Sequence, residues 1–130
     1  MPFITTRKEA ARAAFASDVV MAGGLGFISN LLPIDLADDR TPLPEGVERQ
    51  VQKIFANLDH LLAAAGLSRG HVVSVRVHLT EFPRLYERMN AAYAGNFPPD
   101  RLPARSVVGV AYLVRGAQIM MDFMLSQELP

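Results

Sequence analysis

An arginine at the junction between a loop and a strand is the residue of this sequence best placed to do chemistry. Arg105 follows Leu102-Pro103-Ala104 and opens the valine-rich run from Ser106 to Val110. A guanidinium offers a planar fork of N–H donors that matches a carboxylate with two hydrogen bonds, and a strand end holds it more rigidly than a loop tip. The other interpretation is structural, with Arg105 capping carbonyl groups or pairing with an acid such as Asp122. The residues alone leave both interpretations open.

Composition argues against several other kinds of site. The chain has no cysteine, which excludes disulfides, thiolate nucleophiles and cysteine metal ligands. Its histidines, His60, His71 and His78, lack the spacing of a metal site, so we expect no bound metal. The 13 basic and 13 acidic residues cancel, and we therefore expect no nucleic-acid and no membrane partner.

Two amphipathic helices are predicted to hold the strands in place. From Val47 to Ala65 apolar residues recur at steps of three and four, the spacing that gives a helix one apolar face, and Gly66 follows as a C-cap residue would. A second helix is expected from Pro83 to Tyr93, where Leu85, Met89 and Tyr93 are spaced four residues apart behind the proline.

Strand signals occupy most of the remaining chain. The short runs Val19-Val20-Met21 and Leu25 to Ser29 flank Gly23-Gly24, and glycines supply the positive φ angles of a hairpin turn. A half-buried strand is expected next, because apolar side chains alternate with Ser74, Arg76 and His78. The side chains expected to point inward there are those of Val73, Val75, Val77 and Leu79.

The two ends of the chain and its longest loop are predicted as follows. Residues 105–113 and 117–126 are expected to form a final hairpin around a tight turn at Val114-Arg115-Gly116. A short edge strand is expected near Phe3-Ile4, within fifteen weakly specified residues. Residues 30–46, rich in proline and aspartate, are predicted to be a surface loop.

The last strand indicates that the protein assembles with copies of itself. Residues 119–125 are apolar at odd and even positions apart from Asp122, so both faces of the sheet need burial. Two helices can cover only one face, and another copy of the chain is the simplest source of a matching surface. The competing interpretation is a sheet that curls strongly over its own side chains.

Length and the N-terminal residues set the remaining expectations. A chain of 130 residues, half of them hydrophobic, suits a single domain over residues 1–130 with one core. The start, Met1 to Lys8, lacks the apolar stretch of a signal peptide, and no run of about 18 apolar residues occurs. We therefore expect a cytoplasmic protein.

The order of the motifs resembles that of the RidA/YjgF family of reactive-intermediate deaminases, also called the endoribonuclease L-PSP family. The segment Pro103-Ala104-Arg105-Ser106 matches the family signature fully, and a valine-rich strand follows it. The likeness covers nearly the whole chain, and its further matches are Ala22-Gly23-Gly24-Leu25, Phe27-Ile28-Ser29, Gln50, Asn57-Leu58, Ala64-Ala65-Gly66-Leu67-Ser68, Val72-Val73, Val77-His78-Leu79-Thr80 and Met89-Asn90-Ala91-Ala92-Tyr93.

The resemblance implies a fold and an activity. The fold would be a chorismate-mutase-like α+β subunit, with a mixed β-sheet and two helices packed on one face, assembled into a homotrimer with ligand clefts between subunits. The activity would be hydrolysis of short-lived enamines and imines of small amino acids to 2-oxo acids and ammonia, without a cofactor. Arg105 would clamp the substrate carboxylate while an ordered water attacks, so orientation and electrostatics would supply the catalysis.

The resemblance also assigns the surroundings of Arg105. Ser29 and Asn90 match the family's polar cleft residues, and the backbone at Val107 would contribute an amide group beside the carboxylate. The family's aromatic cleft residue, usually tyrosine, falls on Phe15 or Ala16 here.

Two further positions depart from the family pattern. Asn30 replaces a glycine and adds a side chain that can protrude into the cleft. Met120 stands where the deaminases have a glutamate that positions the attacking water, a task a thioether cannot perform. Asp122 lies one pleat further along the same strand face, about 7 Å away, and is not taken as a substitute.

The departures leave two main functional hypotheses. The first is an enzyme that deaminates an imine or enamine of a small carboxylic acid. The second is a non-catalytic or divergent trimer that binds a small carboxylate at Arg105. A third, ribonuclease activity, has little support, because the chain is neutral and carries no basic surface studded with aromatic residues.

Overall fold

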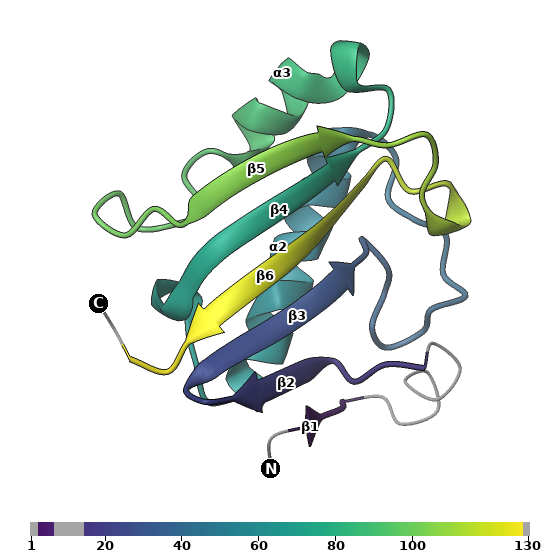
Figure 1. Ribbon diagram of the computed structural model, residues 1–130. Coiled ribbons are helices and arrows are strands. Elements are labelled where there is room, and N and C mark those ends of the chain that lie inside the picture. The colour runs from purple at the N-terminus through teal and green to yellow at the C-terminus, as the bar shows by residue number, and fades with distance from the viewer. Residues whose placement is uncertain (1–2, 7–14, 129–130) are drawn as a thin grey trace.

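A single mixed sheet backed by two long helices makes up the structure (Figure 1). The computed structural model describes residues 3–6 and 15–128. Over these ranges the strands follow the order β1-β2-β3-β6-β4-β5 across the sheet. The elements are β1 (Phe3–Ile4), β2 (Val19–Ala22), β3 (Leu25–Leu31), α2 (Val47–Ala64), the 3-10 turn η1 (Arg69–His71), β4 (Val72–Leu79), α3 (Phe82–Tyr93), β5 (Ala104–Gly109), the 3-10 turn η2 (Val114–Gly116) and β6 (Ile119–Ser126).

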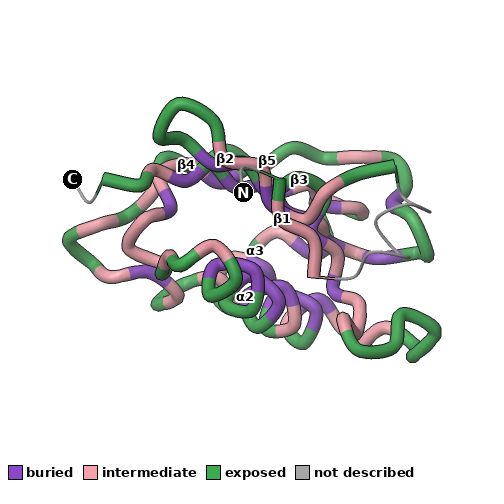
Figure 2. The backbone as a smooth tube through the Cα atoms, turned by 90° about the horizontal axis from the view of Figure 1, so that it is seen from below, coloured by how far each residue is buried: buried purple, intermediate pink, exposed green. Residues whose placement is uncertain are grey.

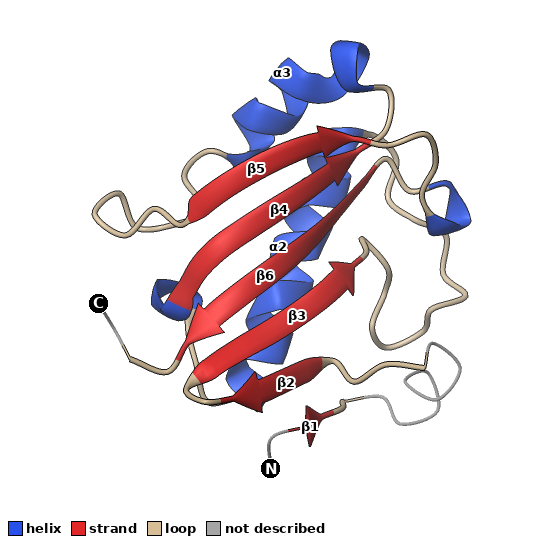
Figure 3. Ribbon diagram, in the orientation of Figure 1, coloured by secondary structure: helices blue, strands red, loops and turns tan. Residues whose placement is uncertain are grey.

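Both long helices lie on the same face of the sheet, as Figure 2 shows from below. The core fills the layer between the sheet and the helices, where α2 lies behind the middle strands and α3 packs against α2 and β4 near the β5 edge (Figure 3). The opposite face, here called the open face, carries half-exposed apolar side chains that include Phe27, Val108 and Met124. The expected placement of two helices on one face is therefore confirmed.

The two helices follow their apolar periodicity. In α2 the residues at steps of three and four, such as Val51, Ile54 and Leu58, are buried, and Gly66 follows the helix at a φ of 73°. The helix α3 buries Leu85 and Met89 and begins one residue before the expected proline.

The first hairpin also forms as predicted. Strands β2 and β3 pair antiparallel, with Val20 opposite Phe27 and Ala22 opposite Leu25. Gly23 and Gly24 have φ angles of 59° and 80°, the left-handed pair that a type I′ turn requires. The short strand β1, also expected, adds to the edge by pairing with β2.

The start of β4 departs from the predicted alternation. Val72 is buried and Val73 is only partly buried, although Val73 was expected to share the inward face with Val75. The pairing of β4 with β6 shifts register between Val72 and Ser74, so a bulge reverses the phase at the strand's first residues. Alternation then continues as predicted through Leu79.

The predicted hairpin between the last two strands is wrong. Strand β5 pairs parallel with β4, with Arg105 opposite Val75, whereas β6 pairs antiparallel with both β4 and β3. The helix α3 supplies the crossover that parallel pairing requires, and the segment with η2 then carries the chain back across the end of β4. β6 takes the central place, and β5 is left at the sheet edge.

Two buried amide side chains on α2 hold the long loop against the helix. Gln50 Nε2 donates to the carbonyl of Pro44 at 3.0 Å, and Gln50 Oε1 accepts from the amide of Gln118 at 2.8 Å. Asn57 Nδ2 donates to the carbonyls of Leu32 and Ile34 at 3.0 and 2.8 Å. These bonds satisfy loop carbonyls that would otherwise be buried without partners.

An exposed ion pair joins the two helices at the first turn of α2. Arg88 donates to Glu48 through Nε at 2.8 Å and through Nη2 at 2.9 Å. These bonds from Arg88, together with the backbone amide of Glu48 itself, lower the pKa of Glu48 from 4.5 to about 2. A carboxyl whose pKa falls on folding stabilises the protein above its unfolded pKa and loses that contribution as the pH falls toward the folded value.

We therefore expect Glu48→Gln to lower the Tm slightly near neutral pH and to have a much smaller effect at about pH 2, where the Glu48 carboxyl is about half protonated in the folded protein. Thermal unfolding followed by circular dichroism at both pH values tests this. Glu45→Gln is the control, because Glu45 is exposed and forms no ion pair with a described residue. An equal loss of Tm at both pH values would contradict the assignment.

Candidate functional site

Arg105 lies at the edge of the sheet on the face that the helices cover. Its position opposite the buried Val75 sets the direction of its side chain toward α3. There Nη1 of Arg105 donates to Oδ1 of Asn90 at 2.8 Å, and the guanidinium carbon lies 4.8 Å from the centroid of the Tyr93 ring. Asn90 and Tyr93 are three residues apart on α3, the spacing that places two side chains on one helix face.

The charge of Arg105 has no protein counter-charge among the described residues. Asp122, the acid considered as a partner, lies on the open face of the sheet, so that alternative is wrong. The hydrogen bond of Arg105 to Asn90 uses only Nη1. Nε and Nη2 are left as the two-pronged donor that a carboxylate can accept.

A groove opens beside this guanidinium and is here called the Arg105 groove. Its volume is about 490 Å³. The lining residues are Asn90, Tyr93, Ala94, Gly95, Asn96, Phe97, Leu102, Pro103 and Arg105. Apolar and aromatic groups form most of the wall, while Asn90 and Arg105 supply a polar end. A small ligand with a carboxylate at one end and an apolar body fits this distribution.

Tyr93 contributes a ring to the site and no proton acceptor. Burial raises the pKa of its hydroxyl to about 12, and the nearby charge of Arg105 only partly opposes that rise. The phenol is therefore protonated at physiological pH and cannot serve there as a general base. Its ring instead makes a cation–π contact with the Arg105 guanidinium.

The predicted site residues on β3 and β6 lie on the open face. Ser29 and Asn30 are at an irregularity of β3 between Ile28 and Leu31, and Asn30 adopts a positive φ of 57°. Met120 lies opposite His78 in the pairing of β6 with β4. These residues form a second group, separate from Arg105.

Asp122, one pleat from Met120, is already engaged on the open face. Its Oδ1 accepts from the backbone amide of Asn30 at 2.7 Å, and its Oδ2 lies 3.7 Å from Nε2 of His78. The Asp122 carboxylate therefore holds the irregular segment of β3 in place. It is not available to position a water in place of the glutamate that Met120 replaces.

Within one chain, the open-face residues Ser29, Asn30 and Met120 lie apart from Arg105. β6 and β4 separate β3 from β5, which amounts to three strand spacings of about 4.8 Å, or roughly 14 Å. Val107 stands with Arg105 on the helix side and is half-buried at the sheet edge, where backbone groups outside the ladder are available. Phe15 has 95% of its surface exposed and so packs against neither group within the chain.

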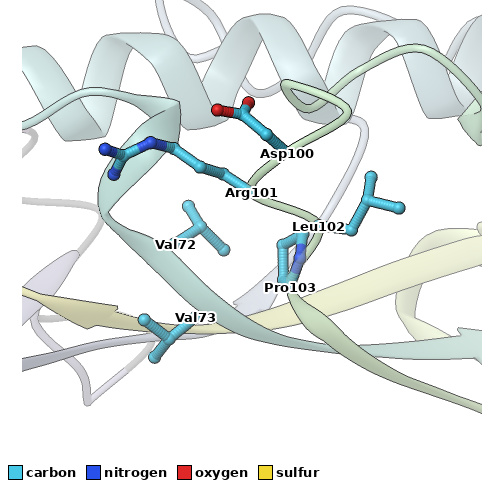
Figure 4. Close-up of a pocket in the computed structure, with 7 residues that line it drawn as sticks. Val72, Val73, Asp100, Arg101, Leu102 and Pro103 are labelled. Atoms are coloured by element: carbon cyan, nitrogen blue, oxygen red, sulfur yellow. The ribbon is translucent and has the colours of Figure 1, made fainter. Parts of the chain in front are cut away.

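A second hollow lies on the other side of the Leu102-Pro103 wall (Figure 4). Its volume is about 390 Å³, and Val72, Val73 and Arg101 contribute to its lining. The side chains of Arg101 and Leu102 extend in opposite directions, so Arg101 is no part of the Arg105 groove. The two hollows share only a stretch of loop.

Among the groove residues that were not predicted from the sequence, Tyr93 and Asn96 carry polar groups. Tyr93 was assigned only to the apolar face of its helix, and Asn96 was assigned to nothing. The three-residue spacing from Asn90 to Tyr93 was a usable signal, because it places both side chains on one face of α3. For Asn96, which lies beyond the end of the helix, no comparable pattern exists.

Within ranges 3–6 and 15–128, no three histidine, aspartate or glutamate side chains gather closely enough to hold a metal ion. No helix in these ranges combines the length and the apolar character needed to cross a membrane.

Comparison with known proteins places the groove inside a matched region. A family model described as Endoribonuclease L-PSP matches residues 5–124. A RutC family protein of Aquifex aeolicus is 33% identical over 107 residues, which are 82% of this chain and 83% of that protein. The matched range of the family model includes all residues of the Arg105 groove.

Two solved structures share the fold. RidA from an Antarctic Psychrobacter species has a TM-score of 0.77 and 30% identity, over 85% of this chain and 86% of that one. The yeast protein YEO7 has a TM-score of 0.82 and 26% identity, over 98% of each chain. The expected RidA-type α+β fold is thereby confirmed.

The stacking of Arg105 on Tyr93 can be measured with a double-mutant cycle. We expect Arg105→Met and Tyr93→Leu to be coupled by about 0.5–1 kcal/mol in urea unfolding, the usual strength of an exposed cation–π contact. Pairing Arg105→Met with Tyr93→Phe is the control, since phenylalanine keeps the ring and only the coupling to the hydroxyl is lost. Strictly additive effects of Arg105→Met and Tyr93→Leu would show that the stacking contributes nothing.

Proposed function

The chain belongs to the RidA/YjgF family, also called the endoribonuclease L-PSP family, and from this membership we propose that it deaminates reactive enamines or imines of small amino acids by hydrolysis. The products would be a 2-oxo acid and ammonia. Arg105 would bind the substrate carboxylate, and the Arg105 groove would hold the adjoining part of the substrate.

The observation that carries this proposal is the state of Arg105. Its guanidinium is held by a hydrogen bond to Asn90 and by the face of the Tyr93 ring, and no described acid forms an ion pair with it. An anchored arginine with free donors loses little conformational entropy when a carboxylate binds. The resemblance assigned Arg105 and Asn90 to one cleft, and their hydrogen bond supports that assignment.

The proposed reaction needs orientation more than reactive side chains. An enamine first takes a proton on carbon and becomes the imine. Water then adds its oxygen to the imine carbon, and the nitrogen accepts protons and leaves as ammonia while the carbon–oxygen double bond forms. Holding the carboxylate at Arg105 fixes the imine carbon relative to the water, which is the contribution that positioning makes to such a step.

A complete cleft would require two copies of the chain. Ser29 and Asn30 on β3 are three strand spacings, roughly 14 Å, from β5 within one chain, and Met120 on β6 is two spacings, about 10 Å, away. All three lie on the face of the sheet opposite Arg105. In the proposed homotrimer, the open face of one copy would approach the Arg105 edge of the next. The exposed ring of Phe15 is a further apolar group available for such a contact.

The methionine at position 120 supports a second candidate function. A thioether is at best a weak acceptor and cannot orient water as a carboxylate does, and Asp122 is already held by Asn30. The alternative is therefore a non-catalytic or divergent trimer that binds a small carboxylate at Arg105. Ribonuclease activity, which the family description names, has less support because the chain has no net charge to attract a polyanion.

The decisive test generates 2-aminoacrylate enzymatically and follows the release of pyruvate with and without this protein. We expect acceleration by the wild type, a loss of about 100-fold in kcat/KM for Arg105→Ala, and a gain for Met120→Glu, because a carboxylate can accept a hydrogen bond from the water. Met120→Leu is the matched control and should behave as the wild type.

The outcomes separate the hypotheses. No acceleration, together with carboxylate binding that Arg105→Ala abolishes, would favour the binding protein. Acceleration that Arg105→Ala leaves unchanged would refute both functions.

The proposed assembly predicts a trimer at micromolar concentration in sedimentation velocity. Phe27→Glu should shift the protein toward monomer, because Phe27 pairs with Met124 on the apolar open face and a buried, unpaired charge there is costly. Gln52→Glu adds the same charge on the solvent side of α2 and should leave the trimer intact. A monomeric wild type would refute the assembly.

A further inference from the structure

Arg69, at the first position of η1, connects three segments behind the Arg105 groove. Its Nε and Nη2 donate to the two carboxylate oxygens of Asp59 on α2 at 2.8 and 2.9 Å. Its Nη1 donates to the backbone carbonyl of Asn96 at 2.8 Å and to Oδ1 of Asn96 at 3.2 Å. We call this set of contacts, Asp59–Arg69–Asn96, the Arg69 bridge.

Asn96 links the Arg69 bridge to the C-terminal end of α3. Its Nδ2 donates to the carbonyls of Ala92 and Tyr93 at 3.0 and 2.8 Å. These are carbonyls of the last helical turn, which lack partners within the helix. Because Oδ1 and the backbone carbonyl of Asn96 both accept from Arg69, the side chain is held in the orientation that makes this cap.

Arg69 also packs on an aromatic cluster made of Phe55, Tyr93 and Phe97, of which Tyr93 and Phe97 line the groove. The guanidinium carbon of Arg69 lies 5.1 Å from the centroid of the Phe55 ring. Phe55 in turn meets Tyr93 and Phe97 edge-on, at centroid distances of 5.6 and 5.5 Å. Tyr93 is the ring on which Arg105 stacks.

These contacts form one continuous path from Asp59 to Arg105. We propose that Arg69 is a positioning residue of the Arg105 groove: it fixes Asn96 and the Tyr93 ring, and through them the guanidinium that would receive the carboxylate. The proposal rests on the proposed function insofar as the groove binds a carboxylate. Arg69 does not line the groove, so it acts only through the residues it holds.

A geometric detail points to arginine in particular. The bridge uses all three guanidinium nitrogens, two on the carboxylate of Asp59 and the third on Asn96. A lysine ammonium keeps the charge but cannot reproduce a planar fork toward Asp59 and a third donor aimed at Asn96. Arg69→Lys should therefore loosen Asn96 while leaving the net charge unchanged.

The chain provides a matched control in Arg88. Its side chain makes an equally short two-pronged bond to Glu48, with distances of 2.8 and 2.9 Å, and likewise joins an element to α2. Neither Arg88 nor Glu48 lines the Arg105 groove. Arg88→Lys thus alters the same kind of interaction on α3 without removing a contact of Asp59, Asn96 or the Phe55 ring.

The experiment uses the full chain and sodium pyruvate as the carboxylate probe. Binding is followed by amide chemical shifts in NMR, hydrogen exchange of the Asn96 and Phe97 amides is measured in the same samples, and Tm is recorded for each protein. We expect Arg69→Lys to weaken pyruvate binding by about fivefold to tenfold, as displacement of a positioned group does, and to speed exchange at both amides. Arg88→Lys should lower Tm to a similar extent and change neither quantity.

A second variant tests the path from its far end. Asp59→Asn leaves the contacts of Arg69 with Asn96 in place but removes the charge that holds the guanidinium, so we expect an effect on pyruvate binding in the same direction and smaller. Arg105→Ala should abolish binding.

The results distinguish failure of this inference from failure of the proposed function. If Arg105→Ala abolishes pyruvate binding while Arg69→Lys leaves both affinity and amide exchange as in the wild type, the role of Arg69 is refuted and the carboxylate site stands. If affinity falls equally in Arg69→Lys and Arg88→Lys, the effect is general destabilisation and the inference is overturned. If the wild type does not bind pyruvate, the carboxylate site fails and the inference fails with it.

Discussion

The insertion of β6 between β3 and β4 is the constraint on which the remaining architecture depends. The last strand of the chain pairs on both sides, so it joins the N-terminal hairpin to the β4–α3–β5 unit. With β4 already paired to β6 on one side, β5 can add only on the other, and it becomes the edge of the sheet. The chain thus places Arg105 at a border, next to α3, and Met120 near the middle of the sheet. The position of each polar group follows from this strand order.

The same strand order divides the polar groups of the molecule between two surfaces. On the helix side, Arg105 and Asn90 face a groove with mostly apolar walls. On the open side, Asp122 links β6 to the irregular turn of β3 through the amide of Asn30. A buried or half-buried carboxylate that already accepts a backbone hydrogen bond cannot readily be redirected, so the chemistry available near Met120 depends on what another molecule brings to it.

Local patterns predicted the elements well because their causes are local. Helical spacing located α2 and α3, and the two glycines located the first turn. The pairing of β5 was mispredicted because two apolar runs around a turn signal resemble a hairpin, and only long-range competition for the free side of β4 decides otherwise.

The bulge at the start of β4 left no pattern in the sequence, and the buried amides of Gln50 and Asn57 were invisible to a polarity pattern. For the site, the resemblance named Arg105 and Asn90 but could not show Tyr93 beneath the guanidinium or Asn96 behind it.

The edge position of β5 also bears on how the protein avoids aggregation. An unpaired strand edge is a template for the strands of other molecules, and proteins commonly protect such edges by keeping them short and by adding charge or proline. β5 has six residues, is preceded by Pro103 and carries Arg105 near its start. The arginine that makes this edge suited to a carboxylate therefore also makes it a poor partner for an unrelated strand, and its replacement by an apolar residue would weaken solubility together with ligand recognition.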